Sequence, residues 1–374
     1  MVSLAGISAK DEKTTINSFG CTGAVYTLGT MSIKKVGSAE FKGWVQSLIK
    51  KHTVYGVQEK EDRFAFDVLE MPEDLRLDYD VTILPPKKYI QPQKEVLLTF
   101  DENGVFESVM NEESFLILGV HPYDMVAISQ MDKVFTKDNR DEHYMAYRER
   151  ATIIVSDVQT ASKDVFAGCM GTSTGEECSG HDVLLTLLPN GSTLLDAKTQ
   201  KGESLLDLIP NAAEPQGEDL EARTAIWESN RKELRKHELH VAPSDLPELL
   251  ERSYDHPVWN EKSELCYACG SCNLVCPTCY CFNVQDDFNW DLKSGTRSRC
   301  WDSCMVSSFA KVAGDHDFRP LAAARYRHRY YRKGKYVPDM IGEIACVGCG
   351  RCITSCTAKI ANPAEVYNRL LEKV

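Results

Sequence analysis

The sequence predicts an α+β protein in which an N-terminal α/β-type domain is followed by a mainly helical domain built around cysteines. Short apolar runs of strand length alternate with segments of helical periodicity as far as about residue 205, which is typical of an α/β domain. Two cysteine runs of identical spacing then lie between residues 266 and 356. The expected limits are an extension over 1–35, the α/β domain over 36–215, a helical linker over 216–260 and the cysteine-rich domain over 261–374.

The elements of the α/β domain follow from periodicity and turn signals. Helices are expected over 41–49, where apolar residues recur at helical spacing, and over 125–135, shortly after Pro122. Strands are expected from short apolar or alternating runs, over 53–57, 63–69, 95–100, 105–110, 115–120, 151–155 and 183–188. Asp101–Gly104 is the expected turn of a hairpin. Leu84–Tyr89 is expected to be extended, because proline disfavours helix before and within itself.

Polar residues follow two of the expected strands. His121 and Asp124 come after the run 115–120, and Asp157 comes after the run 151–155. Open α/β sheets bind ligands at the carboxyl ends of their strands, so these side chains are candidate ligand contacts. The interpretation that we favour is a strand-to-helix turn in which Asp124 caps the helix.

The second half is expected to be mainly helical. Residues 218–239 are dense in charge and are interpreted as a solvent-exposed helix and linker. A further helix begins near Ser244 or Asp245, either of which suits a cap, and leads into the first cysteine run. Between the two runs, residues 307–313 and 321–332 have helical composition.

The two cysteine runs share the spacing C-x2-C-x2-C-x3-C, which is the run of bacterial ferredoxins. Three thiolates on such a loop hold three corners of an iron–sulfur cubane, and in two-cluster ferredoxins the fourth cysteine crosses to the other cluster. We therefore expect two [4Fe–4S] clusters. The expected ligands are Cys266, Cys269, Cys272 and Cys356 for one cluster, and Cys346, Cys349, Cys352 and Cys276 for the other.

Zinc sites and disulfides are the alternatives for these cysteines. Structural zinc usually takes four ligands from two separated C-x2-C pairs, whereas each run here adds a third and a fourth cysteine. Disulfides imply an oxidising compartment, and the N-terminus lacks the ordered regions of a secretory signal. Fifteen cysteines without such a signal favour metal ligation in a reducing cytoplasm, and exposed oxygen-sensitive clusters favour an anaerobic host.

Four further cysteines lie between the two runs. Cys279, Cys281, Cys300 and Cys304 form two close pairs, so four thiols are present for a third metal centre. Their spacings match no standard cluster loop. The favoured interpretation is therefore small buried side chains beside the clusters.

The remaining cysteines lie in the N-terminal half. Cys169 and Cys178 bound a stretch rich in Gly, Ser and Thr, whose amides would suit a phosphate or a flavin. A flexible surface loop is the favoured interpretation of this stretch. Cys21 has no second cysteine near it in the sequence and is interpreted as a plain thiol.

A basic and aromatic run, Arg325–Lys335, stands in a protein whose formal net charge is -12. That overall charge argues against nucleic acid as a partner. Ligated cubanes carry net negative charge, so nearby Arg and Lys would offset it, raise the reduction potential and offer a docking site for an acidic electron carrier. A solvated helix face is an equal alternative. No apolar run reaches the roughly 18 residues of a transmembrane helix, so no membrane span is expected.

With these residues in view, the chain resembles a known family. It is similar to the electron-transfer (beta) subunit of sulfhydrogenase and the A subunit of anaerobic sulfite reductase, a 4Fe-4S dicluster-domain family, over about residues 38–360. The motifs that carry the resemblance are Cys266–Cys281, Arg299–Cys304, Val312–Pro320 and Cys346–Cys352, with Leu84–Lys88 and Leu118–Asp124 upstream. The chain departs from the family at Tyr123, where members commonly have cysteine, and at Phe166–Cys169, where members tend to have a Phe-Cys pair.

The resemblance implies an α-helical ferredoxin module and a relay function. A flavoprotein partner that binds FAD and NAD(P) would exchange electrons with this chain. The chain would pass them singly to a catalytic partner, which is a hydrogenase, a sulfite or sulfur reductase, or a heterodisulfide-reductase-type complex, with ferredoxin as a further candidate. The alternatives are a redox enzyme with a flavin or sulfur-substrate site in its N-terminal domain, and a scaffold whose clusters only hold the fold.

Overall fold

The computed structural model describes residues 31–210 and 212–372. Residues from Met31 onward form one compact unit, so the expected α/β and cysteine-rich regions are packed together. Cys21 and most of the expected extension lie outside the described residues. The sheet nevertheless starts inside that extension, because Ile33–Val36 already forms strand β1 and pairs with β9.

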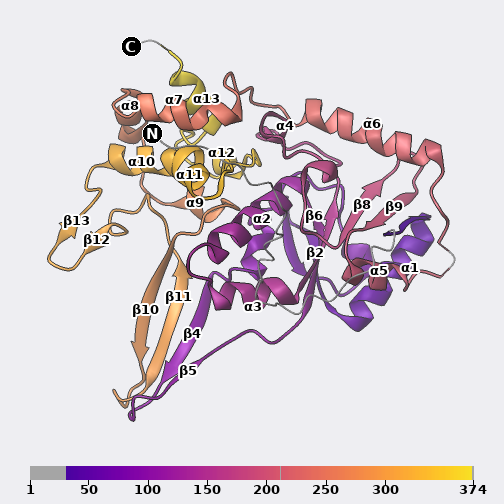
Figure 1. The fold of residues 1–374 in the computed structure, drawn as a ribbon, viewed down its shortest axis with the longest axis horizontal. Coiled ribbons are helices and arrows are strands. Elements are labelled where there is room, and N and C mark those ends of the chain that lie inside the picture. The colour runs from indigo at the N-terminus through magenta and orange to yellow at the C-terminus, as the bar shows by residue number, and fades with distance from the viewer. Residues whose placement is uncertain (1–30, 211, 373–374) are drawn as a thin grey trace, which may run out of the picture. The chain divides into compact units, whose positions relative to one another are not determined.

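A seven-stranded sheet forms the centre of the N-terminal part (Figure 1). Its strands are β1 (Ile33–Val36), β2 (Thr53–Lys60), β3 (Arg63–Val68), β6 (Phe115–Val120), β7 (Ala151–Ser156), β8 (Val183–Leu187) and β9 (Thr193–Ala197). They lie in the order β1-β9-β8-β7-β6-β2-β3, in which β2, β6, β7 and β8 are parallel to one another. Strand β6 is buried along its whole length, as its uninterrupted apolar sequence predicts.

Helices cover both faces of this sheet. They are α1 (Ser38–Lys51) and α5 (Gln200–Leu206) on one face, and α2 (Pro122–Thr136) and α3 (Glu142–Arg150) on the other. Successive residues of β6 alternate between the two cores, because side chains of a strand point to opposite faces. Leu116 and Leu118 pack with α1, whereas Phe115 and Ile117 pack with α2.

The charged segment after residue 216 folds as α6 (Gly217–Glu233), which is helical as expected but is not a free linker. Trp227 and Asn230 on this helix donate hydrogen bonds to Asp157 Oδ2 (2.9 Å) and to the carbonyl oxygen of Val158 (3.1 Å). These contacts attach α6 to the chain that follows β7, so the expected linker is part of the packed N-terminal region.

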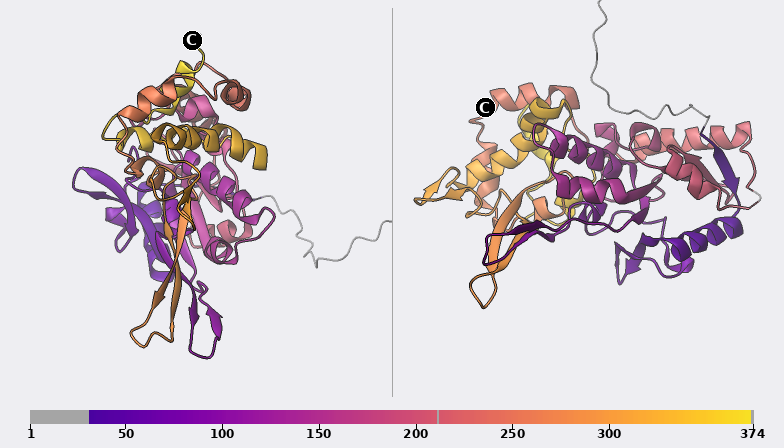
Figure 2. Two further views of the ribbon diagram at one scale, coloured as in Figure 1. Left: turned by 90° about the vertical axis from the view of Figure 1, so that its left-hand side faces the viewer. Right: turned by 60° about the horizontal axis from the view of Figure 1, so that its bottom comes forward.

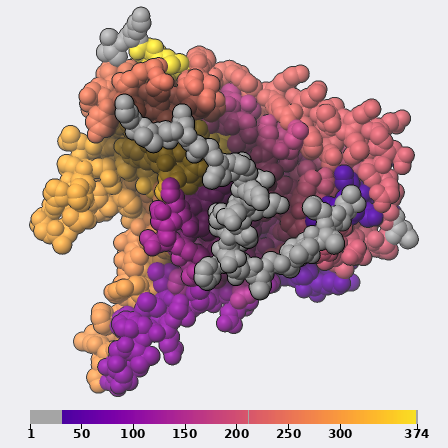
Figure 3. All heavy atoms as spheres, in the orientation of Figure 1, coloured from indigo at the N-terminus to yellow at the C-terminus, as the bar shows by residue number. Residues whose placement is uncertain are grey.

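A four-stranded antiparallel sheet joins distant parts of the chain. Strands β4 (Lys94–Phe100) and β5 (Phe106–Ser108) form the expected hairpin, and β10 (Phe282–Phe288) and β11 (Gly295–Trp301) extend it in the order β10-β11-β4-β5. Figures 2 and 3 show the orange hairpin beside the purple one. The expectation that the segment between the cysteine runs is mainly helical is wrong here, because β11 finds its partner in β4.

The rest of the C-terminal region is mostly helical. Its helices are α7 (Leu246–Arg252), α8 (Val258–Glu264), α9 (Ser271–Leu274), α10 (Ala322–Tyr331), α11 (Val337–Ile341), α12 (Arg351–Thr354) and α13 (Pro363–Arg369), with a π-helical turn over Arg332–Tyr336. Their core is strongly aromatic and includes Trp259, Tyr326, Tyr330, Tyr331 and Tyr367. No helix within residues 31–210 and 212–372 is long and apolar enough to cross a membrane.

Two local expectations are wrong. Pro86–Tyr89 forms a 3-10 turn instead of an extended segment, because Pro86 occupies the first helical position, where no backbone N–H is needed. Residues 307–313 are not a helix but turns that lead into β12 (Lys311–Val312), which pairs with β13 (His316–Asp317). The other short elements are α4 (Ala167–Met170) and the 3-10 turns Pro72–Asp74, Gly175–Glu177 and Pro243–Asp245.

Candidate metal centre

The two cysteine runs fold into loops of the same conformation. In the first loop, Ala268 and Gly270 have φ of 53° and 79°. At the equivalent positions of the second loop, Gly348 and Gly350 have φ of 67° and 77°. Each loop then enters a single helical turn, α9 or α12. The identical cysteine spacing therefore corresponds to identical local geometry.

Two cavities each have four cysteines in their walls. One is lined by Cys266, Cys269, Cys272 and Cys356, and the other by Cys276, Cys346, Cys349 and Cys352. Each set takes three cysteines from one run and the last cysteine of the other run. The structure thus brings the eight thiols together in the crossed sets expected from the sequence, and their role as ligands stays a prediction.

The chemistry of these walls suits thiolate-bound clusters. Burial raises the pKa of the Cys272 and Cys346 thiols to about 12, so both would be protonated without a metal. A coordinating metal removes that proton, because its charge favours the thiolate. A [4Fe–4S] cluster is held by four such thiolates, which is the number that each cavity offers. Nowhere in the described ranges do three Cys, His, Asp or Glu side chains converge as a single metal ion would require.

Two buried cations from the basic run lie against the second cavity. Arg329 and Lys333 both line it and are only 4% and 9% exposed. Lys333 Nζ donates to the carbonyl oxygen of Thr278 at 2.7 Å, and Arg329 donates to the carbonyl oxygen of Cys272 at 3.4 Å. Burial acts to raise the pKa of Cys276, but the charges of Lys333 and Arg329 help to lower it below the usual value. The run is therefore not simply a solvated helix face, because these charges lie beside the cysteines.

Asp124 is bound inside the protein instead of facing a ligand. Its carboxylate accepts two hydrogen bonds from Arg351 of α12, at 2.6 and 2.7 Å, and both residues are at most 3% exposed. Arg351 also donates to the carbonyl oxygen and hydroxyl of Thr82, at 2.8 and 2.9 Å. Asp124 makes no capping hydrogen bond at the start of α2, so that expectation is wrong. The pair instead fastens the start of α2 to the second cysteine loop.

His121 is equally enclosed. Its ring stacks on Tyr79 with centroids 3.9 Å apart, and its Nδ1 lies 2.6 Å from the hydroxyl of Tyr123. Burial lowers the pKa of His121 well below its usual value, so the imidazole is neutral. His121 therefore packs against its neighbours in the core between the sheet and α2.

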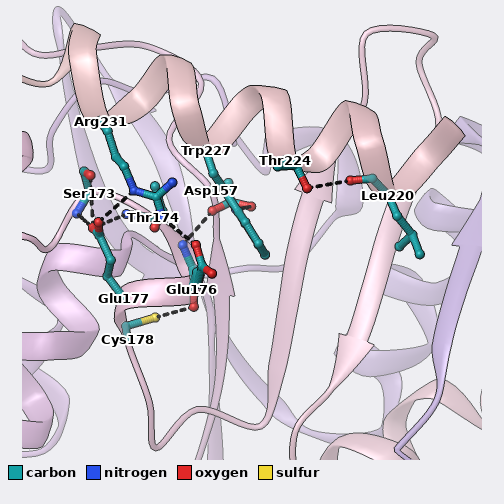
Figure 4. A network of polar contacts seen from close by, with 11 residues as sticks. Asp157, Ser173, Thr174, Glu176, Glu177, Cys178, Leu220, Thr224, Trp227 and Arg231 are labelled. Carbon is teal, nitrogen blue, oxygen red and sulfur yellow. Dashed lines mark hydrogen bonds and ion pairs between the residues drawn. The ribbon is translucent and has the colours of Figure 1, made fainter. Parts of the chain in front are cut away.

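In the stretch between Cys169 and Cys178, backbone amides are bound by the carboxylate of a residue of the same stretch (Figure 4). Glu177 Oε2 accepts hydrogen bonds from the backbone amides of Ser173 and Thr174, at 2.5 and 3.1 Å. Both of those residues are fully buried. The amides that would hold a phosphate are thus already satisfied, and the stretch is not a flexible surface loop. Both interpretations of this stretch are wrong.

Asp157 has a structural role in the same network (Figure 4). It accepts hydrogen bonds from the amide of Gly175 (2.9 Å), the hydroxyl of Thr186 (2.7 Å) and Nε1 of Trp227 (2.9 Å). Burial raises the pKa of Asp157, and these three hydrogen bonds oppose that change. The carboxylate holds the end of β7 to β8 and α6.

The four cysteines between the runs do not act as one group. Cys279, Cys281 and Cys304 line a third, smaller cavity. Cys300 is not among its lining residues, and its Sγ lies 3.8 Å from the carbonyl oxygen of Asn283 on β10. Of the four cysteines that were weighed as a third metal centre, three therefore lie together and Cys300 lies apart from them.

Two side chains at the site were not predicted from the sequence. Lys87 is 4% exposed, donates to the carbonyl oxygen of Cys279 and lies 4.2 Å from the ring centre of Trp301. Arg351 is the charged residue within the second cysteine loop, where the first loop has Ser271. That asymmetry was a signal for Arg351, whereas nothing local marks Lys87 as buried.

Replacing Gly348 by alanine is expected to destabilise the protein by about 2–4 kcal/mol, because the change adds a steric clash to a left-handed backbone. A Cβ at Gly348 would lie 2.6 Å from the amide nitrogen of Ala167, which is backbone and cannot rotate away. Gly342→Ala is the matched control, since Gly342 has φ of 77° and nothing within 4 Å. Denaturant unfolding under anaerobic conditions measures both variants. Equal losses would show that the contact with Ala167 carries no strain.

Comparison with known proteins gives this geometry a context. The model of a 4Fe-4S dicluster domain matches residues 265–360, which contain both cysteine runs. Sulfhydrogenase 2 subunit beta of Pyrococcus furiosus is 31% identical over 334 residues, which cover 88% of this chain and 96% of that protein. The chain belongs to the sulfhydrogenase beta subunit family. The resemblance drawn from the sequence is thereby confirmed, and this family member is an iron–sulfur protein with two [4Fe–4S] clusters.

Proposed function

We propose that this chain relays single electrons between a partner that binds FAD and NAD(P) and a catalytic partner. The catalytic partner would be a hydrogenase, a sulfite or sulfur reductase, or a heterodisulfide-reductase-type complex. The observation that carries the proposal is the crossing of the two thiol sets, which makes Cys276 and Cys356 tie the two cavities together. The Pyrococcus furiosus relative is a beta subunit, which supports the existence of partners. The fifteen cysteines of the sequence suit a reducing, cytoplasmic setting, and oxygen-sensitive clusters suit an anaerobic one.

In this proposal each thiol set holds one [4Fe–4S] cluster. When bound, such a cluster supplies reversible one-electron transfer. The backbone of the two loops positions the thiols, and the buried aromatic core of α8, α10 and α13 limits access of water to them. Arg329 and Lys333 place positive charge beside the second set, which favours the more negative, reduced state.

Metal analysis of the full chain tests the ligand assignment. After anaerobic purification and reconstitution with iron and sulfide, the chain is expected to hold at least about eight iron atoms, two cubanes' worth. The double variant Cys346→Ala/Cys352→Ala should lose about four of them, because the second set keeps only two thiols. Cys178→Ala is the control, since that thiol lines neither cavity. Zinc in place of iron, or an iron content near four or less in the unaltered chain, would contradict the proposal.

Isolation of the native complex tests the partners. A tagged chain drawn from its own cells under anaerobic conditions is expected to carry a flavoprotein and a catalytic subunit with it. NAD(P)H should then reduce the clusters in the complex but not in the isolated chain. Reduction of the isolated chain by NAD(P)H would argue against a separate flavoprotein partner.

A second candidate function rests on a cavity of about 640 Å³ beside the second loop. It is lined by Arg63 and Lys163, which follow β2 and β7, and by Arg351, Thr354 and Ser355 from the cysteine region. Its volume is within the usual range for small-molecule sites. This observation favours the alternative that the chain is a redox enzyme with its own flavin or sulfur-substrate site. Flavin that stays bound to the isolated chain, and is lost in Lys163→Glu, would support this candidate.

A further inference from the structure

The third cavity is lined by Cys279, Cys281 and Cys304, which belong to neither of the two crossed sets. Cys279 and Cys304 are 7% and 3% exposed, and Cys281 lines the same cavity. The side chains of all three cysteines line this one cavity, together with Asn273 and Thr278. Asn273 Nδ2 donates to Cys304 Sγ at 3.1 Å. Three thiols therefore share one small pocket, and two of them are buried.

Buried positive charge surrounds these thiols. Lys87, Arg329 and Lys333 are each at most 9% exposed. In the described residues their hydrogen bonds go to uncharged oxygens: Lys87 to a carbonyl, Arg329 to a carbonyl and the Asn273 amide, and Lys333 to the carbonyl and hydroxyl of Thr278. Burying cations without anions is costly, so this region requires compensating negative charge.

The second thiol set accounts for only part of that charge. Arg329 and Lys333 line the cavities of both the Cys276 set and the three leftover thiols. Lys87 lines none of the three cavities, but it donates to the backbone carbonyl oxygen of Cys279, whose side chain lines the third cavity. Arg332, which lies over the Tyr280 ring at 4.3 Å, joins Arg329 and Lys333 as the third cation in the wall of the third cavity and lines neither cavity of the crossed sets. Arg332 and Lys87 therefore add positive charge beside the three leftover thiols that the cavity of the second set does not share.

We propose that Cys279, Cys281 and Cys304 are thiolate ligands of a third iron–sulfur centre. Each thiol gives its proton to solvent as its sulfur bonds iron, and no electron is exchanged in that step. The resulting negative charge compensates Lys87, Arg329 and Lys333. Thr278 connects the centre to the second set, because its hydroxyl lies 3.4 Å from Cys276 Sγ and it precedes Cys279. Use of the centre as a further relay step rests on the proposed function, whereas its assembly does not.

The test compares three full-length chains, each purified anaerobically, reconstituted with iron and sulfide, and freed of loose metal with a chelator. They are the unaltered chain, Cys281→Ala/Cys304→Ala, and the control Cys300→Ala, whose thiol is outside the cavity. We expect the unaltered chain and the control to hold about two to four irons more than the roughly eight of two cubanes. The double variant should hold roughly eight irons and lose one electron paramagnetic resonance signal after reduction with dithionite.

The outcomes separate the two proposals. Roughly eight irons in the unaltered chain, or equal iron in all three chains, would overturn the third centre and leave the two clusters standing. Zinc as the additional metal would also overturn it. A content clearly below eight irons in the double variant, with its folding intact by circular dichroism, would instead count against the crossed sets. If the double variant does not fold, the iron and sulfide content of the unaltered chain still decides the matter.

Discussion

Replacing Asp124 by alanine is expected to destabilise the folded protein by about 3–5 kcal/mol, because it leaves a buried guanidinium without its carboxylate. Arg351 is 3% exposed and Asp124 is fully buried, so water cannot replace the two lost hydrogen bonds. Arg351, which loses its partner, stands directly before Cys352. The second cysteine loop should therefore become less well ordered. Denaturant unfolding of the anaerobic, cluster-loaded protein, followed by circular dichroism and by visible absorbance, measures both effects.

Two further variants show whether the loss comes from the unpaired charge. Asp124→Ala/Arg351→Met removes the carboxylate and the guanidinium together, and it should restore much of the stability, since no lone charge is left buried. Lys133→Ala breaks an exposed pair between α2 and Glu343, and it should cost at most about 1 kcal/mol. If Asp124→Ala proves no more harmful than Lys133→Ala, the buried pair does not fasten the loop to α2.

The sequence predicts the elements whose side chains follow one period. The run 115–120 is apolar throughout and forms the fully buried β6, and the hairpin around Asp101–Gly104 follows from its turn residues. The pairing of β11 with β4 could not be predicted, because it joins residues such as Arg299 and Glu95 that lie far apart in the sequence. The local sequence of neither strand specifies its partner. Composition alone therefore predicts helices for this region.

The part of the site that depends on cysteine spacing could be predicted from the sequence. Cysteine spacing alone groups the eight thiols as the two cavities do. The spacing does not show which way the long basic side chains point, because Arg327 and Arg329 are the same residue type in the same basic run. Only the packing of α10 turns Arg329 inward and leaves Arg327 on Tyr254, 3.6 Å from the ring centre. The separation of Cys300 from Cys304 likewise depends on where β11 ends.

Replacing Arg329 by glutamine is expected to lower the reduction potential of the cluster on the second thiol set. The reduced state carries one more negative charge, so loss of a nearby cation disfavours it. At an effective dielectric constant of about 20, a unit charge about 8 Å away changes the reduction free energy by roughly 2 kcal/mol, or about 90 mV for one electron. A redox titration followed by electron paramagnetic resonance, on the anaerobic full chain, measures the shift.

The controls for this prediction come from the same helix. Arg329→Lys keeps the charge and should hold most of the potential, although it loses the fork-shaped contacts to Asn273 and Cys272. Arg327→Gln removes a cation that lines neither cysteine cavity, so its potentials should stay close to those of the unaltered chain. Equal shifts in Arg329→Gln and Arg327→Gln would mean that the potential responds to net charge alone. A shift confined to Arg329→Gln would establish that burial beside the thiols makes this one charge of the basic run effective.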